Sequence, residues 1–428
     1  MGSSMNAPTV GGPAPWSQRM RGYFLAMAFT TGIFAAIDRQ LVGVLLQSIK
    51  TDLHASDTQM GLLTGTYFSL FQVIAIFPLA RIADYGNRKN LIALTIGAWS
   101  LATMLCGLAQ NYTQIAIAIC LVAIGEAGSG PAGASLITDI FPPKTRTRVF
   151  GLLASGGAAG IAFGVFLGGT LNDLLGWRHV FLVVGAPGVA FALLYFLTIK
   201  EPARLGAPHV GARPSVFRSL ATFWKIPTYR LLLFFNLMAP ITGFATLSWT
   251  PAFLMRVHHL TGRQVGLFMA LAIIFGSVLG NLFSGFVGDH LQKRSPRWLL
   301  YVSGGGILLA PPLVMVIVFN PSVAVVLGAL GAFMFVAATY TPCNSAAAMS
   351  VAPPRSRALA QAIATLFTTI GAAIGPLYVG MMNDRLTPQY GAEAIRISMA
   401  TVALPALLAG LAALLFAGLI DKDIERAV

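Results

Sequence analysis

The chain has 428 residues, of which 56% are hydrophobic and 10% are charged, and its mean hydropathy is +0.76. A soluble globular domain does not need so much apolar surface, whereas many windows reach the ~20 apolar residues with which a helix crosses a ~30 Å hydrocarbon core. A net charge of +14 would suit a nucleic-acid partner, but the basic residues lie almost entirely between the apolar runs. We therefore predict an all-α polytopic membrane protein with no nucleic-acid partner.

Twelve transmembrane helices are predicted, six in each half of the chain. They are expected at about 22–47, 58–80, 90–109, 113–138, 149–172, 179–198, 231–255, 264–288, 298–319, 322–345, 357–382 and 396–419. The resulting units are a mobile cytoplasmic N-terminal tail (1–17), an N-terminal half (18–198), a cytoplasmic loop (199–230), a C-terminal half (231–420) and a cytoplasmic C-terminal tail (421–428).

The distribution of Lys and Arg predicts the orientation of these helices. Of the 28 basic residues, 21 fall in the two tails and the even-numbered loops, and six fall in the odd-numbered loops. This excess places both termini in the cytoplasm and suits contacts with anionic lipid headgroups. We expect a monomer in the cell membrane.

The first helix carries two adjacent charges, Asp38 and Arg39, deep in an apolar run. A charge at that depth costs at least ~2.5–3.5 kcal/mol, so such residues face a cavity or a partner. Adjacent helical residues point about 100° apart, so at least one of the two needs a partner on another helix. The pair is interpreted as functional, with a packing salt bridge as the alternative.

A charged segment after the second helix, Ala80–Lys89, recurs after the eighth as Gly285–Arg294. Each copy keeps one acid followed by two bases, at Asp84, Arg88 and Lys89 and at Asp289, Lys293 and Arg294. The acids are 205 residues apart, which indicates a duplicated unit. We interpret the copies as a cytoplasmic gate, with plain positive-inside anchoring as the alternative. The basic loop after the fourth helix offers Arg146 and Arg148 as partners for Asp84 or Asp139.

The fourth helix contains Glu126 within the sequence G-E-A-G-S-G-P-A-G. Burial disfavours the charged carboxylate and a nearby Arg39 favours it, and this competition suits a group that binds and releases a proton. The alternative is a carboxyl that stays protonated for structural reasons. The fifth helix carries a glycine stripe that predicts close helix packing.

The second half lacks charged residues in the central parts of its helices. It offers polar and aromatic side chains instead, as does part of the first half. The candidates for the cavity lining are Tyr67, Phe71, Ser129, Tyr340, Asn344 and Thr365. An uncharged second half would suit an acyl chain, so an amphipathic cargo is favoured over a wholly polar one.

Two halves of six helices, each with a charged segment after its second helix, resemble the major facilitator superfamily, whose loop motif is G-x-x-x-D-(R/K)-x-G-x-(R/K)-(R/K). Four pieces resemble its Spinster-like subfamily: I-D-R-Q, A-D-Y-G-N-R-K, I-G-E-A-G-S-G-P-A and F-P-P-K-T-R-T-R. Spinster-like proteins move lysophospholipids or sphingosine phosphate, some with proton coupling. The resemblance implies that Asp38 and Glu126 couple a proton and that Arg39 binds an anionic headgroup.

These observations predict a secondary active transporter that works by alternating access. No G-x-x-x-x-G-K-[ST] segment occurs, so an ion gradient is expected to supply the energy, with the proton as coupling ion and no cofactor. No catalytic residues and no metal ligands are expected. A symporter of a small organic anion and a drug/proton antiporter stay open as alternatives, and a membrane enzyme or receptor is disfavoured.

Overall fold

The computed structural model describes residues 16–202, 223–352 and 357–427, and every element within them is a helix. Eleven stretches are long and apolar enough to cross a membrane. The last of them, Leu359–Leu415, has 57 residues and contains two antiparallel passes, so the described residues form twelve passes. The predicted all-α membrane fold is confirmed.

The N-terminal half consists of passes 1 to 6 and a short connecting helix. Its elements are α1 (Gln18–Val44), α2 (Leu46–Asp52), α3 (Asp57–Gly61), η1 (Leu62–Thr66), α4 (Tyr67–Tyr85), α5 (Arg88–Gly107), α6 (Tyr112–Ile140), α7 (Pro143–Leu175) and α8 (Trp177–Thr198). The second pass is one continuous helix of α3, η1 and α4, in which η1 is a π-helical turn.

The C-terminal half consists of passes 7 to 12 and a terminal helix. Its elements are α10 (Pro227–Val257), α11 (Gly262–Ala272), η2 (Ile273–Val278), α12 (Leu279–Leu291), α13 (Trp298–Leu308), α14 (Ala310–Phe319), α15 (Val323–Val351), α16 (Arg357–Tyr390), η4 (Gly391–Glu393), α17 (Ala394–Thr401), α18 (Ala403–Leu415) and α19 (Leu419–Ala427).

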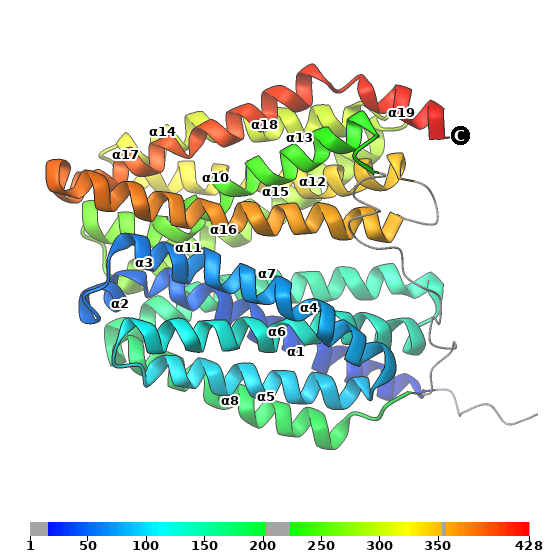
Figure 1. The fold of residues 1–428 in the computed structure, drawn as a ribbon, viewed down its shortest axis with the longest axis horizontal. Coiled ribbons are helices and arrows are strands. Elements are labelled where there is room, and N and C mark those ends of the chain that lie inside the picture. Colours follow the sequence, from blue (N-terminus) through cyan, green and yellow to red (C-terminus); the bar gives the residue numbers. More distant parts are fainter. Residues whose placement is uncertain (1–15, 203–222, 353–356, 428) are drawn as a thin grey trace, which may run out of the picture.

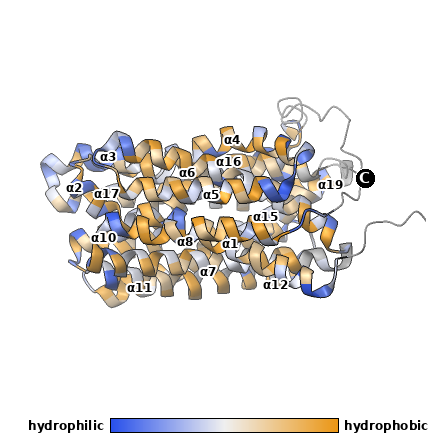
Figure 2. Cartoon of the chain, turned by 90° about the horizontal axis from the view of Figure 1, so that it is seen from below, coloured by the Kyte–Doolittle hydropathy of each residue, from blue (hydrophilic) through white to orange (hydrophobic). Residues whose placement is uncertain are grey.

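The two halves lie side by side as separate helical layers (Figure 1). The hydropathy pattern is that of a membrane protein, with an apolar middle and hydrophilic residues gathered toward the two ends (Figure 2). We call the end that carries α19 the proximal end and the end that carries α2 and α3 the distal end. The Lys and Arg distribution predicts that the proximal end is cytoplasmic.

Several helices extend beyond their predicted limits. The second pass runs to Tyr85, so Asp84 is still helical and the connection to α5 is only Gly86 and Asn87 rather than a longer hairpin. The eleventh pass likewise continues to Tyr390. Hydropathy marks only the part of a helix inside the hydrocarbon, whereas hydrogen bonding continues the helix into the polar region.

The glycine stripe of the fifth pass packs against the first pass. A Cβ added at Gly160 would lie 2.6 Å from the Ile33 carbonyl oxygen, and one at Gly164 would lie 2.8 Å from the Ile37 Cα. Small residues let membrane helices approach closely in this way. The position of α1, and therefore of Asp38 and Arg39, depends on this contact.

We expect Gly160→Ala to destabilise the protein by about 1–3 kcal/mol, because the added methyl group overpacks the α1–α7 contact. Gly157 lies in the same helix, and a Cβ there meets nothing within 4 Å, so Gly157→Ala is the matched control. Thermal unfolding of the detergent-purified variants measures the effect. Equal melting temperatures for both variants would contradict the packing described here.

Candidate functional site

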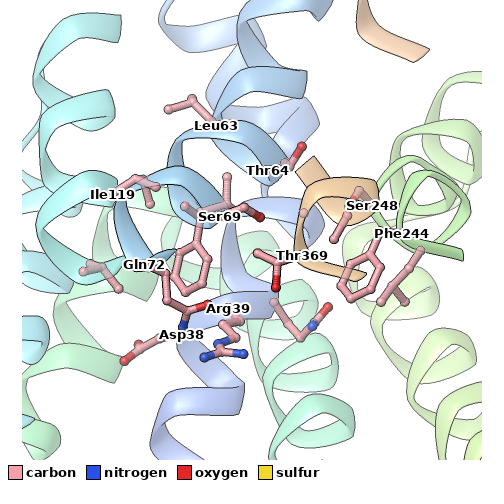
Figure 3. A pocket seen from close by; sticks show the side chains of 18 of the residues that line it. Asp38, Arg39, Leu63, Thr64, Ser69, Gln72, Ile119, Phe244, Ser248 and Thr369 are labelled. Carbon is pink, nitrogen blue, oxygen red and sulfur yellow. The ribbon is translucent and has the colours of Figure 1, made fainter. Parts of the chain in front are cut away.

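A cavity of about 160 Å³ lies between the two halves. Figure 3 shows side chains that line it. It is bordered by α1, the second pass and α6 of the first half and by α10 and α16 of the second. Its lining includes Asp38, Arg39, Gln40, Leu63, Thr64, Phe68, Ser69, Gln72, Ile119, Val122, Phe244, Leu247, Ser248, Thr368, Thr369 and Ala372. The π-helical turn η1 contributes to this wall, and such turns are frequent at functional sites.

An ion pair between α1 and α6 carries the charge of this cavity. The Nε atom of Arg39 donates a hydrogen bond to the Oε2 atom of Glu126 at 2.7 Å. The Glu126 side chain is 1% exposed and the Arg39 side chain 46% exposed. Phe68 supports the guanidinium, which lies 5.2 Å from the ring centroid. Arg39 therefore faces the cavity, and Glu126 lies behind it.

Close packing of α6 against α5 explains why Glu126 is buried. A Cβ at Gly125 would lie 2.7 Å from the Trp99 side chain, and one at Gly128 would lie 2.6 Å from Thr95. These glycines bring the two helices together on either side of Glu126. The second carboxylate oxygen, Oε1, has no hydrogen-bond partner among the described residues.

Asp38 points away from Arg39, as the 100° rotation between neighbours requires. It is 7% exposed and lies toward α5, near Trp99 and Thr103, with its Oδ1 atom unpartnered among the described residues. Glu126, the other buried acid of this region, lies nearby. Of these two buried acids, only Glu126 is paired with the Arg39 guanidinium.

The six side chains expected to line the cavity have other neighbours in the structure. Tyr340 packs against Phe235, with ring centroids 5.5 Å apart, and Asn344 is buried with both amide atoms unpartnered among the described residues. Ser129 donates to the Glu126 carbonyl and Thr365 to the Gln361 carbonyl.

None of these four, and neither of the half-buried Tyr67 and Phe71, belongs to the described lining of this cavity. In the second pass, the cavity is lined instead by the residues next to them in the sequence, Phe68 and Gln72. One step along a helix rotates a side chain by 100°, and the sequence alone does not determine that rotation.

The first copy of the charged motif joins elements of one half. Arg88 is 1% exposed and forms ion pairs with Asp139 of α6 and with Glu201, whose Oε1 is 2.7 Å from the Arg88 Nε atom. Glu201 also accepts the backbone N–H of Lys89, whose ammonium group lies 4.7 Å from the Phe196 ring. Sequence reasoning missed Glu201, which follows the last residue of α8 by three positions.

Arg88 thus holds Asp139, for which Arg146 and Arg148 were the expected partners. Arg146 and Arg148 lie in the first turns of α7. Their side chains, and the side chain of Asp289, are not among those that the structure describes. Lys293 and Arg294 are exposed after the end of α12, and Asp84 lies near the end of α4. The gate role of the motif stays a prediction.

The distal end contains a buried ion-pair cluster between the halves that the sequence analysis missed. Arg256 of α10 donates from Nη1 and Nη2 to the two carboxylate oxygens of Asp57, both at 2.8 Å. Lys50 lies 2.6 Å from the same carboxylate, and Gln47 accepts from the Arg256 Nε atom at 2.6 Å. The sequence signal was only a cap residue and a basic residue at a helix end, which gave no reason to pair them.

Comparisons with known proteins were consistent with this architecture. The sequence profile of the Major Facilitator Superfamily matches residues 28–376 and 276–427. An MFS-type efflux pump of Mycolicibacterium smegmatis is 31% identical over 369 residues, covering 85% of each chain. Protein spinster homolog 1 of Rattus norvegicus is 27% identical over 427 residues, covering 91% of this chain and 79% of the relative.

A solved structure is similar over nearly the whole chain. It is the crystal structure of a bacterial homolog to human lysosomal transporter Spinster, in an inward-facing and unoccupied conformation. The TM-score is 0.85 at 27% sequence identity, and the match covers 95% of this chain and 99% of the other.

We expect Arg88→Ala to destabilise the N-terminal half by about 3–5 kcal/mol, because Asp139 and Glu201 lose their buried partner. Lys89→Ala is the neighbouring control and removes only the contact with the Phe196 ring. The yield of monodisperse protein and its melting temperature measure the difference. An Arg88→Ala protein as stable as the Lys89→Ala protein would show that the ion pairs do not support the fold.

Proposed function

The chain belongs to the Major Facilitator Superfamily, among its Spinster-like members, and we propose that it is a proton-coupled transporter of an amphipathic organic anion. A lysophospholipid or a sphingosine-phosphate-like lipid is the cargo class. The chain is a transporter and not an enzyme. We place it in the cell membrane with both termini in the cytoplasm, in accordance with its basic loops.

The observation that carries the proposal is the half-exposed guanidinium of Arg39 beside the buried carboxylate of Glu126. Arg39 binds either that carboxylate or the anionic group of a cargo molecule in the cavity. Protonation of Glu126 removes the competing anion and so strengthens binding of the cargo. By thermodynamic linkage, a bound cargo also favours protonation, so proton and anion travel in the same direction.

The cavity walls suit the two parts of an amphipath differently. The first half supplies every charged group of the lining, and the second half supplies Phe244, Leu247 and Ala372 beside three hydroxyl side chains. The head of the cargo would lie against the first half, and its chain would extend along the second. Rocking of the two halves about this central site gives alternating access.

A small hydroxylated organic anion is the second candidate cargo. The cavity of about 160 Å³ suits a small molecule, and hydroxyl and amide side chains reach it from both halves, among them Thr64, Gln72, Ser248, Thr368 and Thr369. Arg39 and Glu126 would act in the same way on this cargo. The two candidates differ in whether transport depends on the length of an acyl chain.

We expect Glu126→Gln to abolish transport driven by a pH gradient and to preserve exchange of cargo across the membrane, because the amide binds no proton but leaves Arg39 free. Proteoliposomes loaded with labelled lysophospholipid measure both activities. Glu393→Gln removes an exposed carboxylate outside the cavity and is the control. A Glu126→Gln protein that still accumulates cargo on a pH gradient would rule out Glu126 as the proton carrier.

We expect Arg39→Ala to reduce transport about 10- to 100-fold, since a hydrogen bond to a charged group contributes about 1.5–3 kcal/mol. Arg39→Lys keeps the charge and should retain part of the activity. The assay compares lysophospholipids of different chain length with a short-chain organic anion. Transport of the short anion alone would support the second candidate, and transport unaffected by Arg39→Ala would contradict both.

A further inference from the structure

Two aspartates close the distal end by binding helix starts of the opposite half. Asp384 of α16 accepts the backbone N–H groups of Asp57 at 2.9 Å and Thr58 at 2.7 Å, at the start of the second pass. Asp173 of α7 accepts the backbone N–H groups of Gly262 at 3.1 Å and Arg263 at 2.7 Å, at the start of α11. In the first contact the acceptor belongs to the C-terminal half and the donors to the N-terminal half. In the second contact these roles are reversed.

The acceptor residues occur in a repeated sequence, G-x-x-N-D. Gly169 precedes Asp173 by four residues, as Gly380 precedes Asp384. Both glycines touch the helix start that their aspartate binds: a Cβ at Gly169 would lie 2.2 Å from the Gly262 carbonyl oxygen, and one at Gly380 equally close to the Asp57 carbonyl oxygen. The glycine therefore brings the helices into contact, and the aspartate one turn later forms the bonds.

The helix starts that supply the N–H donors also have a repeated sequence pattern. Both helix starts carry a capping box, Ser56 with Gln59 and Thr261 with Gln264, and the copies are 205 residues apart, as are Asp84 and Asp289. A capping box satisfies the N–H groups of the cap residue and of the third helical residue. The first and second N–H groups remain, and these are the groups that the aspartates bind.

We propose that Asp173 and Asp384 form a duplicated latch between the halves, which stabilises the conformation closed at the distal end and must release for that end to open. Each carboxylate combines two charge-assisted hydrogen bonds with the positive end of a helix. The two donors of each site are neighbouring backbone groups at one helix start. Moving the halves apart therefore breaks both hydrogen bonds of a site at the same time. The two aspartates are positioning residues that act on the equilibrium between conformations and do not touch cargo.

Distances across the distal end test the latch directly. Spin labels at Thr51→Cys in α2 and Ala392→Cys in η4, both exposed and in opposite halves, report opening by double electron–electron resonance. The native Cys106, Cys120 and Cys343 are first replaced. We expect Asp173→Ala and Asp384→Ala each to raise the open-to-closed ratio roughly 2- to 30-fold, the range that corresponds to loss of one helix cap, and the double variant to raise it further.

Asp52→Ala is the matched control, because Asp52 forms an ion pair at the same end but with Arg178 of its own half. Its distance distribution should equal that of the parent protein. A double variant with the parent distribution, or an equal shift in Asp52→Ala, would overturn the latch. If an alanine variant does not fold, Asp173→Asn and Asp384→Asn keep an acceptor without the charge and should give smaller shifts in the same direction. The measurement needs no cargo, so its outcome is independent of the proposed substrate and proton coupling.

Discussion

The structure depends on one constraint, that a charge inside hydrocarbon must have a partner or face water. Arg39 and Glu126 meet this condition together, one at the cavity and one behind it. Arg88, which is buried at the proximal end, is likewise paired with Asp139 and Glu201. Asp38 meets it only in part, since one of its oxygens has no partner among the described residues. This incomplete pairing at the centre of the first half is consistent with the proton coupling that we propose.

The halves share their helical plan but not their chemistry. The charged groups at the centre all belong to the first half, whereas the second half contributes aromatic, aliphatic and hydroxyl side chains to the same cavity. The distal end, by contrast, is built from matching parts of both halves, with an aspartate, a glycine and a capped helix start in each. The two halves thus carry matching residues at the distal end, where they contact each other, and different residues around the central cavity.

The contacts between the halves explain how one end closes. Hydrogen bonds and ion pairs that join two described residues of opposite halves lie in the distal part, at Asp57, Thr66, Asp173 and Arg256 with their partners. Close approach of Gly61 to Pro376 and of Gly266 to Val165 adds packing there. If the halves separate at this end, these contacts break together, because the two sides of each contact belong to different halves.

The sequence alone was sufficient to predict the fold class and the twelve passes. It also singled out Asp38, Arg39 and Glu126, since isolated charges stand out in apolar runs, and the roles of these residues stay predictions. It could not determine the rotation of each helix, so Phe68 rather than Tyr67 lines the cavity. It also could not pair Asp57 with Arg256, or Asp173 and Asp384 with helix starts in the other half, because nothing local distinguishes such residues from ordinary helix ends. Hydropathy and periodicity record how each segment meets the membrane, whereas these pairings exist only once the two halves are packed together.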